Sequence, residues 1–422
     1  MLWGVNMFLV YSIIYPIVIF LLFIPQYLKR PKELRGKWVR EKLGLLPDMD
    51  HSIWVHAVSV GEVNAAIRLL RRLRGKYPDK RVVLSTVTDT GQKVARDKVP
   101  EGVSVVYLPF DISRVLSKAF GRVKPEMLIV METELWPNIF RLANKRNVPV
   151  IILNGRISEK SSQGYKMISF FMKNVFSCVT VFSMQSGLDA ERLKAIGADE
   201  KKVLVSGNFK FDMEMSGKMP VWTASVKGPV IMAGSTHRGE EELVLSAYLK
   251  NCEKFPGLRL ILAPRHPERF GEVADMLRSR GISFVRRSEL VENDSAGGPF
   301  KEKVLLLDSV GELSSLYAIA DIAVIGKSFI GTGGQNPLEP AYWGKPILCG
   351  PHMENFPFMQ EFYDEGAAFE VQPASLADKI GELLADPDSA KAAGNKARRI
   401  YESKSGAVEK AMEIIEKYIS NG

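Results

Sequence analysis

Short apolar runs alternate with amphipathic helical stretches from about residue 50 onward, and these runs are rich in β-branched residues. The first set of runs lies at 52–58, 82–88, 127–131, 148–153, 178–183 and 202–207. A second set follows at 229–235, 259–264, 282–285, 303–308, 321–326 and 345–350. Continuous apolar strands separated by helices are typical of a parallel sheet covered by helices. The pattern therefore predicts two Rossmann-like α/β domains.

The N-terminal part of the chain has a different pattern, because the twenty residues from Val5 to Ile24 carry no charge. As a helix they would roughly match the ~30 Å hydrocarbon thickness of a bilayer, so they predict a transmembrane anchor. A cleaved signal peptide is the alternative, but no basic stretch precedes the run and no small-residue cleavage site follows it. We expect the body of the protein to fold without this anchor.

Basic residues follow the apolar run directly. Between Lys29 and Lys42 seven basic residues stand against two acidic ones, a local net charge of +5 out of the chain's +9. A solvated charge run is one interpretation. At this position, however, the charge favours a body on the cytoplasmic side and attraction to anionic headgroups.

The pattern divides the chain into six segments. They are an anchor at 1–28, a basic juxtamembrane segment at 29–50, a first domain at 51–215, a linker at 216–228, a second domain at 229–400 and a C-terminal helix at 401–422. The linker is placed where mixed polarity, glycine and proline break any period. We expect the last helix to pack back on the first domain, and residues 287–302 to form a mobile surface loop.

Composition excludes several classes of function. The three cysteines form no C-x-x-C pair, which predicts neither a zinc knuckle nor a disulfide framework and fits a reducing compartment. The remaining charge is spread over the body and does not predict nucleic-acid binding. Asp48 and Asp50 resemble a D-x-D metal motif, but they precede the first strand, so we expect no metal site and no cofactor.

Charged side chains follow three predicted strands of the first domain. Glu62 lies in the first turn of a helix, where a carboxylate can also simply complement the helix dipole. Glu132 and Glu134 follow a continuous apolar strand, where charges are costly unless they are paired or used, and a salt bridge within the fold is the alternative. Lys210 follows a later strand and could reach a phosphate, although a solvated lysine is the ordinary interpretation.

The second domain carries polar clusters at its predicted strand ends. Arg265 and His266 offer donors for phosphate or base oxygens. Gly331, Gly333 and Gly334 permit a tight turn into a helix with Asn336 at its cap and Glu339 in its first turn. Capping explains this arrangement adequately, but such a turn can also bind an anion, with a carboxylate left to accept ribose hydroxyls.

Eight motifs together resemble one family, the 3-deoxy-D-manno-octulosonic acid (Kdo) transferases. They are HAVSVGE, METELWPN, GNFKFD, AGSTHRGE, PRHPER, GELxxxYxxAD, GGQNPLEP and GPHMENF, in this order over nearly the whole chain. The resemblance implies a GT-B glycosyltransferase fold, in which two Rossmann-like domains face a cleft. It also implies transfer of Kdo from CMP-Kdo to a lipid A precursor with inversion, at the bacterial inner membrane and with the catalytic body in the cytoplasm. No nucleic-acid or protein partner is implied.

The resemblance also assigns roles to residues. Glu62 becomes the general base, and Glu132 and Lys210 support the transition state. CMP binding falls on Arg265, His266, Val310, Gly311, Glu312, Asn336, Pro337, Leu338 and Glu339. Two positions depart from the family pattern: Lys327 stands where a second glycine is usual, and Gln335 where histidine is frequent.

Two other functions stay open at this point. A GT-B enzyme that uses a UDP-sugar, whether a transferase or an epimerase, would share the fold and the C-terminal glutamate. A membrane-tethered lipid A binder without catalysis would need the cleft but no base. The motifs also do not distinguish enzymes that add one, two or several Kdo residues.

Overall fold

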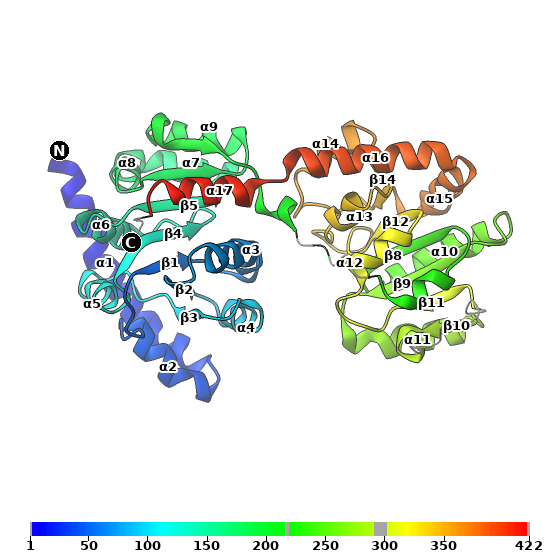
Figure 1. Ribbon diagram of the computed structural model, residues 1–422, viewed down its shortest axis with the longest axis horizontal. Coiled ribbons are helices and arrows are strands. Elements are labelled where there is room, and N and C mark those ends of the chain that lie inside the picture. Colours follow the sequence, from blue (N-terminus) through cyan, green and yellow to red (C-terminus); the bar gives the residue numbers. More distant parts are fainter. Residues whose placement is uncertain (1, 214, 216–218, 291–301, 420–422) are drawn as a thin grey trace. The chain divides into compact units, whose positions relative to one another are not determined.

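The computed structural model describes residues 2–213, 215, 219–290 and 302–419. The chain forms two compact units (Figure 1). Unit 1 comprises Met1–Met213 together with Lys404–Gly422, and unit 2 comprises Glu214–Ser403. The chain therefore leaves unit 1, builds unit 2 and returns to unit 1 for its last helix.

Unit 1 contains a parallel sheet with strands in the order β3-β2-β1-β4-β5-β6-β7. The strands are β1 Ser52–His56, β2 Arg81–Thr86, β3 Val103–Tyr107, β4 Pro125–Met131, β5 Val150–Gly155, β6 Val181–Met184 and β7 Val203–Val205. The helices are α1 Leu2–Leu28, α2 Lys32–Lys42, α3 Val60–Lys76, α4 Asp89–Lys98, α5 Ser113–Val123, α6 Pro137–Lys145, α7 Glu159–Met167, α8 Ser169–Ser177, α9 Gly187–Ile196 and α17 Ala407–Glu416. The central strands are buried along their length, as expected for a sheet covered on both faces.

Two hydrophobic layers enclose this sheet. One layer, around Trp54 and Phe182, contains residues from α5, α6, α8 and α9. The other, around Ile53 and Val55, contains residues from α3, α4 and α17. The start of α17 is fixed by the Asp212 carboxylate, which accepts hydrogen bonds from the Gly406 and Val408 N–H groups at 2.5 and 2.6 Å.

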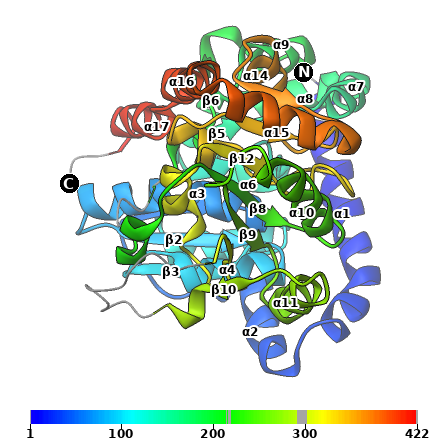
Figure 2. The same ribbon diagram turned by 90° about the vertical axis from the view of Figure 1, so that its right-hand side faces the viewer.

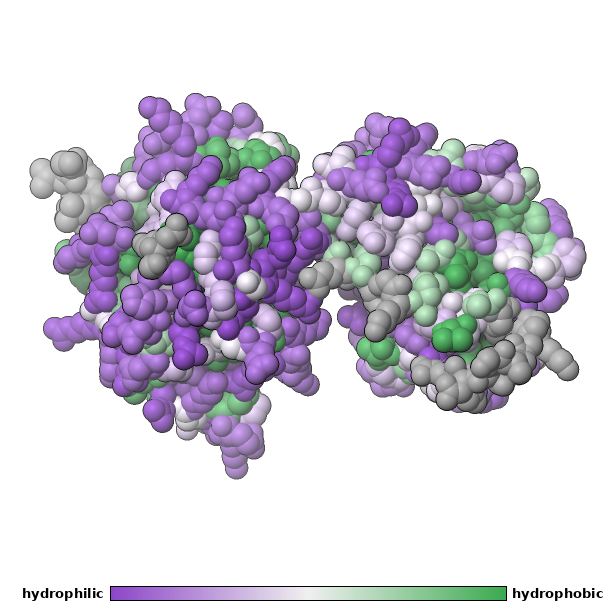
Figure 3. Space-filling model, in the orientation of Figure 1, coloured by the Kyte–Doolittle hydropathy of each residue, from purple (hydrophilic) through white to green (hydrophobic). Residues whose placement is uncertain are grey.

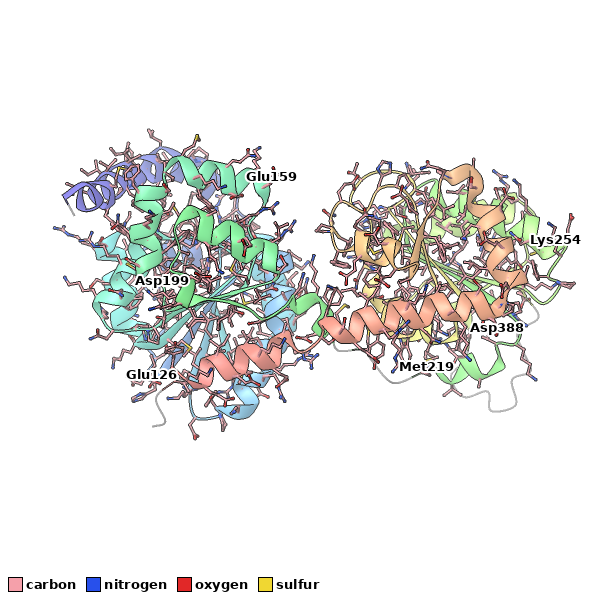
Figure 4. All side chains as sticks on the ribbon, turned by 90° about the horizontal axis from the view of Figure 1, so that it is seen from above. Glu126, Glu159, Asp199, Met219, Lys254 and Asp388 are labelled. Carbon is pink, nitrogen blue, oxygen red and sulfur yellow. The ribbon has the colours of Figure 1, made fainter. Side chains whose placement is uncertain are left out.

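Unit 2 contains a second parallel sheet, in the order β10-β11-β9-β8-β12-β13-β14. Its strands are β8 Val230–Thr236, β9 Arg259–Pro264, β10 Phe284–Arg286, β11 Val304–Leu306, β12 Ile322–Ile325, β13 Ile347–Cys349 and β14 Ala368–Glu370. Its helices are α10 Glu240–Cys252, α11 Phe270–Ser279, α12 Leu313–Leu316, α13 Leu338–Tyr342, α14 Met359–Asp364, α15 Leu376–Ala385 and α16 Pro387–Lys404 (Asp388 in its first turn is labelled in Figure 4). Two α/β domains with parallel sheets confirm the predicted fold class.

Two strands lie outside the predicted runs, and each is at an edge of its sheet. β3, with the sequence VSVVY, has a strand-like composition, but its first three residues are only half-buried. β14 has three residues, and only Ala368 is buried. An edge strand packs against one neighbour only, so its apolar run is short and its sequence signal is weak.

The segments predicted as a linker and as a mobile loop are partly ordered within unit 2. A 3₁₀ turn over Val221–Ser225 places Trp222 in the core beside Val230 and Leu305. Arg287, at the start of the predicted loop, is buried and belongs to a 3₁₀ turn. Residues 216–218 and 291–301 lie outside the described part of the chain, so the loop prediction is untested there.

The N-terminal helix α1 packs along unit 1 instead of standing apart from it. Met7–Leu28 is long and apolar enough to cross a membrane, with a mean hydropathy of 2.6. The helix runs along the far side of unit 1 in Figure 1 and along the right-hand edge in Figure 2. Phe8 is buried against the unit, and Phe23 packs on Trp38 with ring centroids 5.4 Å apart. The helix is therefore packed on unit 1, and the expectation that the body folds without it stays a prediction.

Part of the basic segment faces the interior. The Arg30 guanidinium lies 4.2 Å from the Trp38 ring centroid and pairs with Asp89 at 3.1 Å. Lys42 is buried against Phe110, and burial, reinforced by the charge of Arg30, lowers the pKa of Lys42 to about 7. The charge that this segment presents to a membrane is therefore smaller than its formal net charge of +5 between Lys29 and Lys42.

Candidate active site

The Glu62 carboxylate is held by hydrogen bonds at the N-terminal end of α3. Ser59 is the N-cap, and its hydroxyl accepts a hydrogen bond from the Glu62 N–H. The carboxylate in turn accepts hydrogen bonds from the Val58 N–H at 2.7 Å and from the Ser59 hydroxyl at 3.0 Å. Only 6% of the residue is exposed. The capping role and the predicted base therefore coincide in one carboxylate.

Burial, together with the negative charges of Glu132 and Glu134, raises the pKa of Glu62 to about 7 against the opposing Val58 and Ser59 hydrogen bonds. Both neighbours follow β4. Glu132 adopts a φ of 56°, in the left-handed region that few non-glycine residues occupy, and its N–H donates to Leu153 O at 2.8 Å. The strand thus ends abruptly at Glu132, and Glu132 and Glu134 lie near enough for their charges to act on Glu62.

Two basic side chains accompany the carboxylates. Burial raises the pKa of Glu132, and the charges of Arg156 and Lys210 oppose this rise. Lys210 is exposed by surface area, but desolvation of its ammonium by the surrounding protein lowers its pKa, against the opposing charge of Glu132 and together with the like charge of Arg156. Lys210 lies in a 3₁₀ turn over Phe209–Asp212 that Asn208 caps by accepting the Lys210 N–H at 2.9 Å.

The structure therefore brings the three predicted catalytic residues of unit 1 together. Glu134, which the sequence had also singled out, lies with them. Arg156 joins them as well, and it was not predicted. Arg156 is positioned by Thr133, whose hydroxyl accepts the Arg156 N–H at 2.9 Å. Its signal in the sequence was its place directly after the predicted strand at 148–153.

At the N-terminal end of β4 the carboxylate is ion-paired. Glu126 (labelled in Figure 4) is paired with Lys80 at 2.6 Å and contacts His51 at 2.6 Å. Its carboxylate is satisfied by these partners, and their charges hold its pKa below the ordinary value against the effect of burial. The carboxylates at the carboxyl ends of the strands have raised pKa values, which is typical of functional sites.

In unit 2, two of the predicted CMP-binding residues follow β9. Arg265 and His266 are exposed, and the Arg265 N–H donates to Thr236 O at 3.0 Å. The His266 ring meets the His237 ring edge-on, with centroids 5.2 Å apart. Burial lowers the pKa of His237, and the charges of His266 and Lys327 add to this effect. His237 was not predicted.

A buried carboxylate organises the turn after β12. Glu240, in the first turn of α10, accepts hydrogen bonds from the backbone N–H groups of His237, Lys327, Phe329 and Ile330 at 2.9, 2.6, 3.0 and 3.3 Å. Lys327 has a φ of 56°, so this position requires the left-handed conformation that glycine adopts without strain. This conformation gives a physical reason for the glycine that the family usually has at the position of Lys327. Gln335, the second departure, contacts His237 at 3.2 Å.

The glycine turn and the short helix α13 differ in detail from the prediction. Gly331, Gly333 and Gly334 all have positive φ, as a tight turn requires. However, the Gly333 N–H donates to Glu354 at 2.6 Å, so part of the predicted anion site is bound by a carboxylate of the protein. Pro337 rather than Asn336 is the N-cap of α13.

The residues Asn336, Pro337, Leu338 and Glu339 still form one compact turn. The Asn336 side chain accepts the Leu338 N–H at 3.1 Å and donates to Glu339 at 3.4 Å. Burial raises the pKa of Glu339 to about 7, opposed by the Asn336 hydrogen bond and by the charge of Arg265. Arg265 and Glu339 therefore belong to the same site.

The segment from Val310 to Glu312 is held through the side chain of its last residue. The Glu312 carboxylate accepts hydrogen bonds from the Arg287 guanidinium at 2.8–3.0 Å and from the Ser309 hydroxyl. Val310 is 80% exposed and Gly311 has a φ of 97°. The Glu312 carboxylate is thus occupied within unit 2, and the exposed groups of the segment are Val310 and its backbone.

The fold is that of known GT-B proteins. The chain is similar to the UDP-GlcNAc 2-epimerase of Neisseria meningitidis, with a TM-score of 0.56 and 12% identity over 87% of this chain and 100% of that one. It is also similar to a glycosyltransferase of Rickettsia africae, with a TM-score of 0.54 and 14% identity over 88% and 100%. At these identities the likeness concerns the fold alone.

The sequence has much nearer relatives. The model of the family described as 3-Deoxy-D-manno-octulosonic-acid transferase (kdotransferase) matches residues 37–213. The 3-deoxy-D-manno-octulosonic acid transferase of Haemophilus influenzae is 33% identical over 87% of each chain. The enzymes of that name from Bordetella pertussis and Aquifex aeolicus are 30% and 31% identical, over 87% and 79% of this chain and 87% and 86% of theirs. With this agreement spanning both units, the chain belongs to the 3-deoxy-D-manno-octulosonic acid transferase family.

Proposed function

We propose that the protein is an inverting glycosyltransferase that moves Kdo from CMP-Kdo to a lipid A precursor in lipopolysaccharide biosynthesis. The observation that carries this proposal is the carboxylate cluster of unit 1. Glu62 has a pKa raised to about 7 by burial and by two neighbouring carboxylates. A general base works best when its pKa lies near the working pH, so Glu62 is suited to take the proton of an acceptor hydroxyl.

Positive charge beside this base supports the other half of the reaction. As Kdo leaves CMP, negative charge develops on the phosphate, and fixed donors stabilise it most when they are already in place. Lys210 and Arg156 are the basic side chains whose charges act on Glu132. We assign leaving-group stabilisation to Lys210, with Glu132 holding the Lys210 ammonium.

In unit 2 we assign the CMP part of the donor to Arg265, His266, Val310 to Glu312 and Asn336 to Glu339. Replacing Glu339 by alanine should weaken CMP binding about 10- to 100-fold, because a hydrogen bond to a charged group contributes about 1.5–3 kcal/mol. Calorimetry with CMP measures the change. Glu365→Ala removes an exposed carboxylate at the end of α14 and should leave the affinity unchanged. Wild-type affinity in both Glu339→Ala and Arg265→Ala would show that the site is misplaced.

The reaction is proposed to need no metal. CMP leaves with a single phosphate, and Lys210 together with backbone N–H groups can balance its charge. Treating the purified enzyme with EDTA should therefore leave the transfer rate within experimental error. Loss of activity on chelation, restored by a divalent cation, would contradict this proposal.

The direct test combines the purified protein, CMP-Kdo and a lipid A precursor in detergent. Release of CMP that depends on the acceptor, with a Kdo-modified lipid seen by mass spectrometry, is the expected result. The product mass also gives the number of Kdo residues added. Lipid binding without CMP release would identify a binding protein, and preference for UDP over CMP would identify a UDP-sugar enzyme.

We further propose that the protein works at the bacterial inner membrane with both units in the cytoplasm. The apolar helix α1 and the exposed lysines Lys29 and Lys32 support this location. Fractionation of the full-length protein should place it with the inner membrane.

A further inference from the structure

One side of α1 is a stripe of side chains that fit unit 1. The stripe consists of Phe8, Tyr11, Ser12, Tyr15, Ile19, Phe23 and Tyr27. These residues recur with helical spacing and so lie on one face of the helix. Phe8 meets Phe171 of α8 with ring centroids 5.4 Å apart, near one end of the stripe. Phe23 meets Trp38 of α2 at 5.4 Å, near the other end.

Hydrogen bonds join the middle of this stripe to buried polar groups. The Tyr11 hydroxyl donates to the Asp111 carboxylate at 2.9 Å, and the Ser12 hydroxyl donates to Asn138 at 3.0 Å. Asp111 also accepts the N–H groups of Asn138 and Ile139, and only 1% of it is exposed. Removing α1 would leave a buried carboxylate with fewer partners, which is costly. The contact is therefore specific.

The other side of α1 is entirely apolar. Its exposed residues are Leu9, Val10, Ile13, Ile14, Ile17, Val18, Phe20, Leu21, Leu22, Ile24 and Leu28, which are 42–79% exposed. The face of unit 1 turned to the viewer in Figure 3 is mostly hydrophilic, and α1 lies behind it. A continuous, solvent-exposed apolar face of this length marks an interaction site.

The length of the docked stripe limits how a bilayer can meet this face. From Phe8 to Tyr27 the helix runs about 29 Å at ~1.5 Å per residue, which is the full ~30 Å of the hydrocarbon core. Helix α6 packs beside α1 and exposes Arg141 and Lys145, and the Arg141 guanidinium lies 5.4 Å from the Phe8 ring. A docked α1 that crossed the bilayer would also carry the part of unit 1 on which it packs, with its charged and hydrogen-bonded groups, into the hydrocarbon, where a charge costs up to about 2.5–3.5 kcal/mol at the centre.

We propose that α1 does not cross the membrane but lies in the plane of one leaflet, docked on unit 1, with its apolar face in the acyl chains. The proposal rests on the membrane location given under Proposed function and adds the orientation. Amphipathic helices that lie in an interface combine such an apolar face with a polar opposite side and basic flanks. Here unit 1, packed on the aromatic stripe, takes the place of the polar side, and Lys29 and Lys32 provide the flank.

A second apolar surface continues this face. Met167 and Phe170, at the junction of α7 and α8, are 81% and 49% exposed, and Phe170 is next to Phe171, which packs on Phe8. Two residues before Met167 stands Tyr165, whose pKa is raised by burial and by the charge of Glu134. The lipid-facing surface thus adjoins the carboxylate cluster. An acceptor lipid could meet Glu62 without leaving its leaflet.

The test measures depth along the helix. In a full-length background with Cys178, Cys252 and Cys349 replaced by alanine, single cysteines are introduced as Val10→Cys, Ile17→Cys and Ile24→Cys. These positions are seven residues apart, hence on one face of α1. Each is labelled with an environment-sensitive fluorophore and reconstituted in phosphatidylethanolamine and phosphatidylglycerol vesicles. Quenching by lipids with spin labels at different acyl depths then gives the position of each label.

We expect equal depths at the three positions and quenching from one leaflet only. Met167→Cys should also be quenched by lipid, whereas Ser246→Cys, exposed on α10, should not. A label at Ile17 deeper than both others, with Val10 and Ile24 quenched from opposite leaflets, would show a spanning helix and overturn the proposal. Absence of lipid quenching together with an oligomer in solution would assign the face to a second copy and also overturn it. Kdo transfer by the same samples is assayed separately, so failure of the proposed chemistry is recognised independently.

Discussion

Replacing Glu62 by glutamine should lower the turnover number by about 10²–10⁴-fold, the range that a general base contributes. Glutamine keeps the size of the side chain and one oxygen acceptor for the hydrogen bonds from Val58 and Ser59, but it cannot take a proton. The assay is Kdo transfer at saturating CMP-Kdo and acceptor. CMP affinity, measured on the same sample, should be unchanged because the assigned donor residues are in unit 2.

The pH dependence makes this prediction specific. The pKa of Glu62 is raised to about 7, so wild-type kcat/KM should fall as the pH drops below about 7, and Glu62→Gln should lose this acidic limb. Because the charge of Glu132 helps to raise that pKa, Glu132→Gln should keep the limb and move it to lower pH. If Glu62→Gln retains near-normal turnover while Glu132→Gln loses the limb, the base is Glu132.

Stability provides a control for the same variant. A carboxyl whose pKa is raised by folding favours the folded state below its unfolded pKa, and that contribution is lost as the pH rises through about 7. Glutamine does not titrate. The difference in unfolding free energy between Glu62→Gln and the wild type should therefore favour the variant more at pH 8 than at pH 5. Any loss from weaker helix capping is the same at both pH values. Thermal unfolding at the two pH values measures this difference.

Replacing Lys210 by methionine should reduce turnover by about 10²–10³-fold, the effect of removing one preorganised donor from a developing negative charge. The pKa of Lys210 is lowered in the folded chain, so its charge does not favour folding at neutral pH and its removal should not lower stability. A rate loss with unchanged thermal unfolding is the expected result. Transfer assays under single-turnover conditions measure the chemical step directly.

A matched control lies nearby in the chain. Lys201 is exposed in the 3₁₀ turn over Glu200–Lys202 and is not assigned to the site, so Lys201→Met should retain wild-type turnover. Lys210→Arg keeps the charge and should recover part of the rate. Equal rates for Lys210→Met and Lys201→Met would remove Lys210 from the catalytic assignment.

The sequence predicted the fold class and the parts of the site that follow strands. Apolar runs such as MLIVM are buried on both faces of a parallel sheet, so both their composition and their length were informative. Glu132 was found because it stands where such a run stops, and Lys210 because it follows the predicted strand at 202–207. The edge strand β14 was missed because its three residues, only one of them buried, leave almost no pattern.

Other features depend on contacts between distant residues and could not be predicted in this way. The buried position of Lys42 depends on Phe110, and the four N–H groups that Glu240 accepts come partly from residues 87–90 positions away. The contact between Tyr11 and Asp111 likewise spans 100 residues. Hydropathy alone indicates that α1 is apolar, but it does not show that one face is already occupied by unit 1.

The return of α17 to unit 1 determines the order in which the protein can be completed during synthesis. Unit 2 is encoded as an insertion, so the ribosome has released all of it before Ala407 appears. Until then the layer around Ile53 and Val55 lacks its C-terminal cover, and Asp212 lacks the N–H groups of residues 406 and 408. Closing a contact over so many residues is entropically expensive and slow. The unit that begins the chain is therefore the last to be finished, and a message truncated just after codon 404 would yield a complete unit 2 attached to an incomplete unit 1.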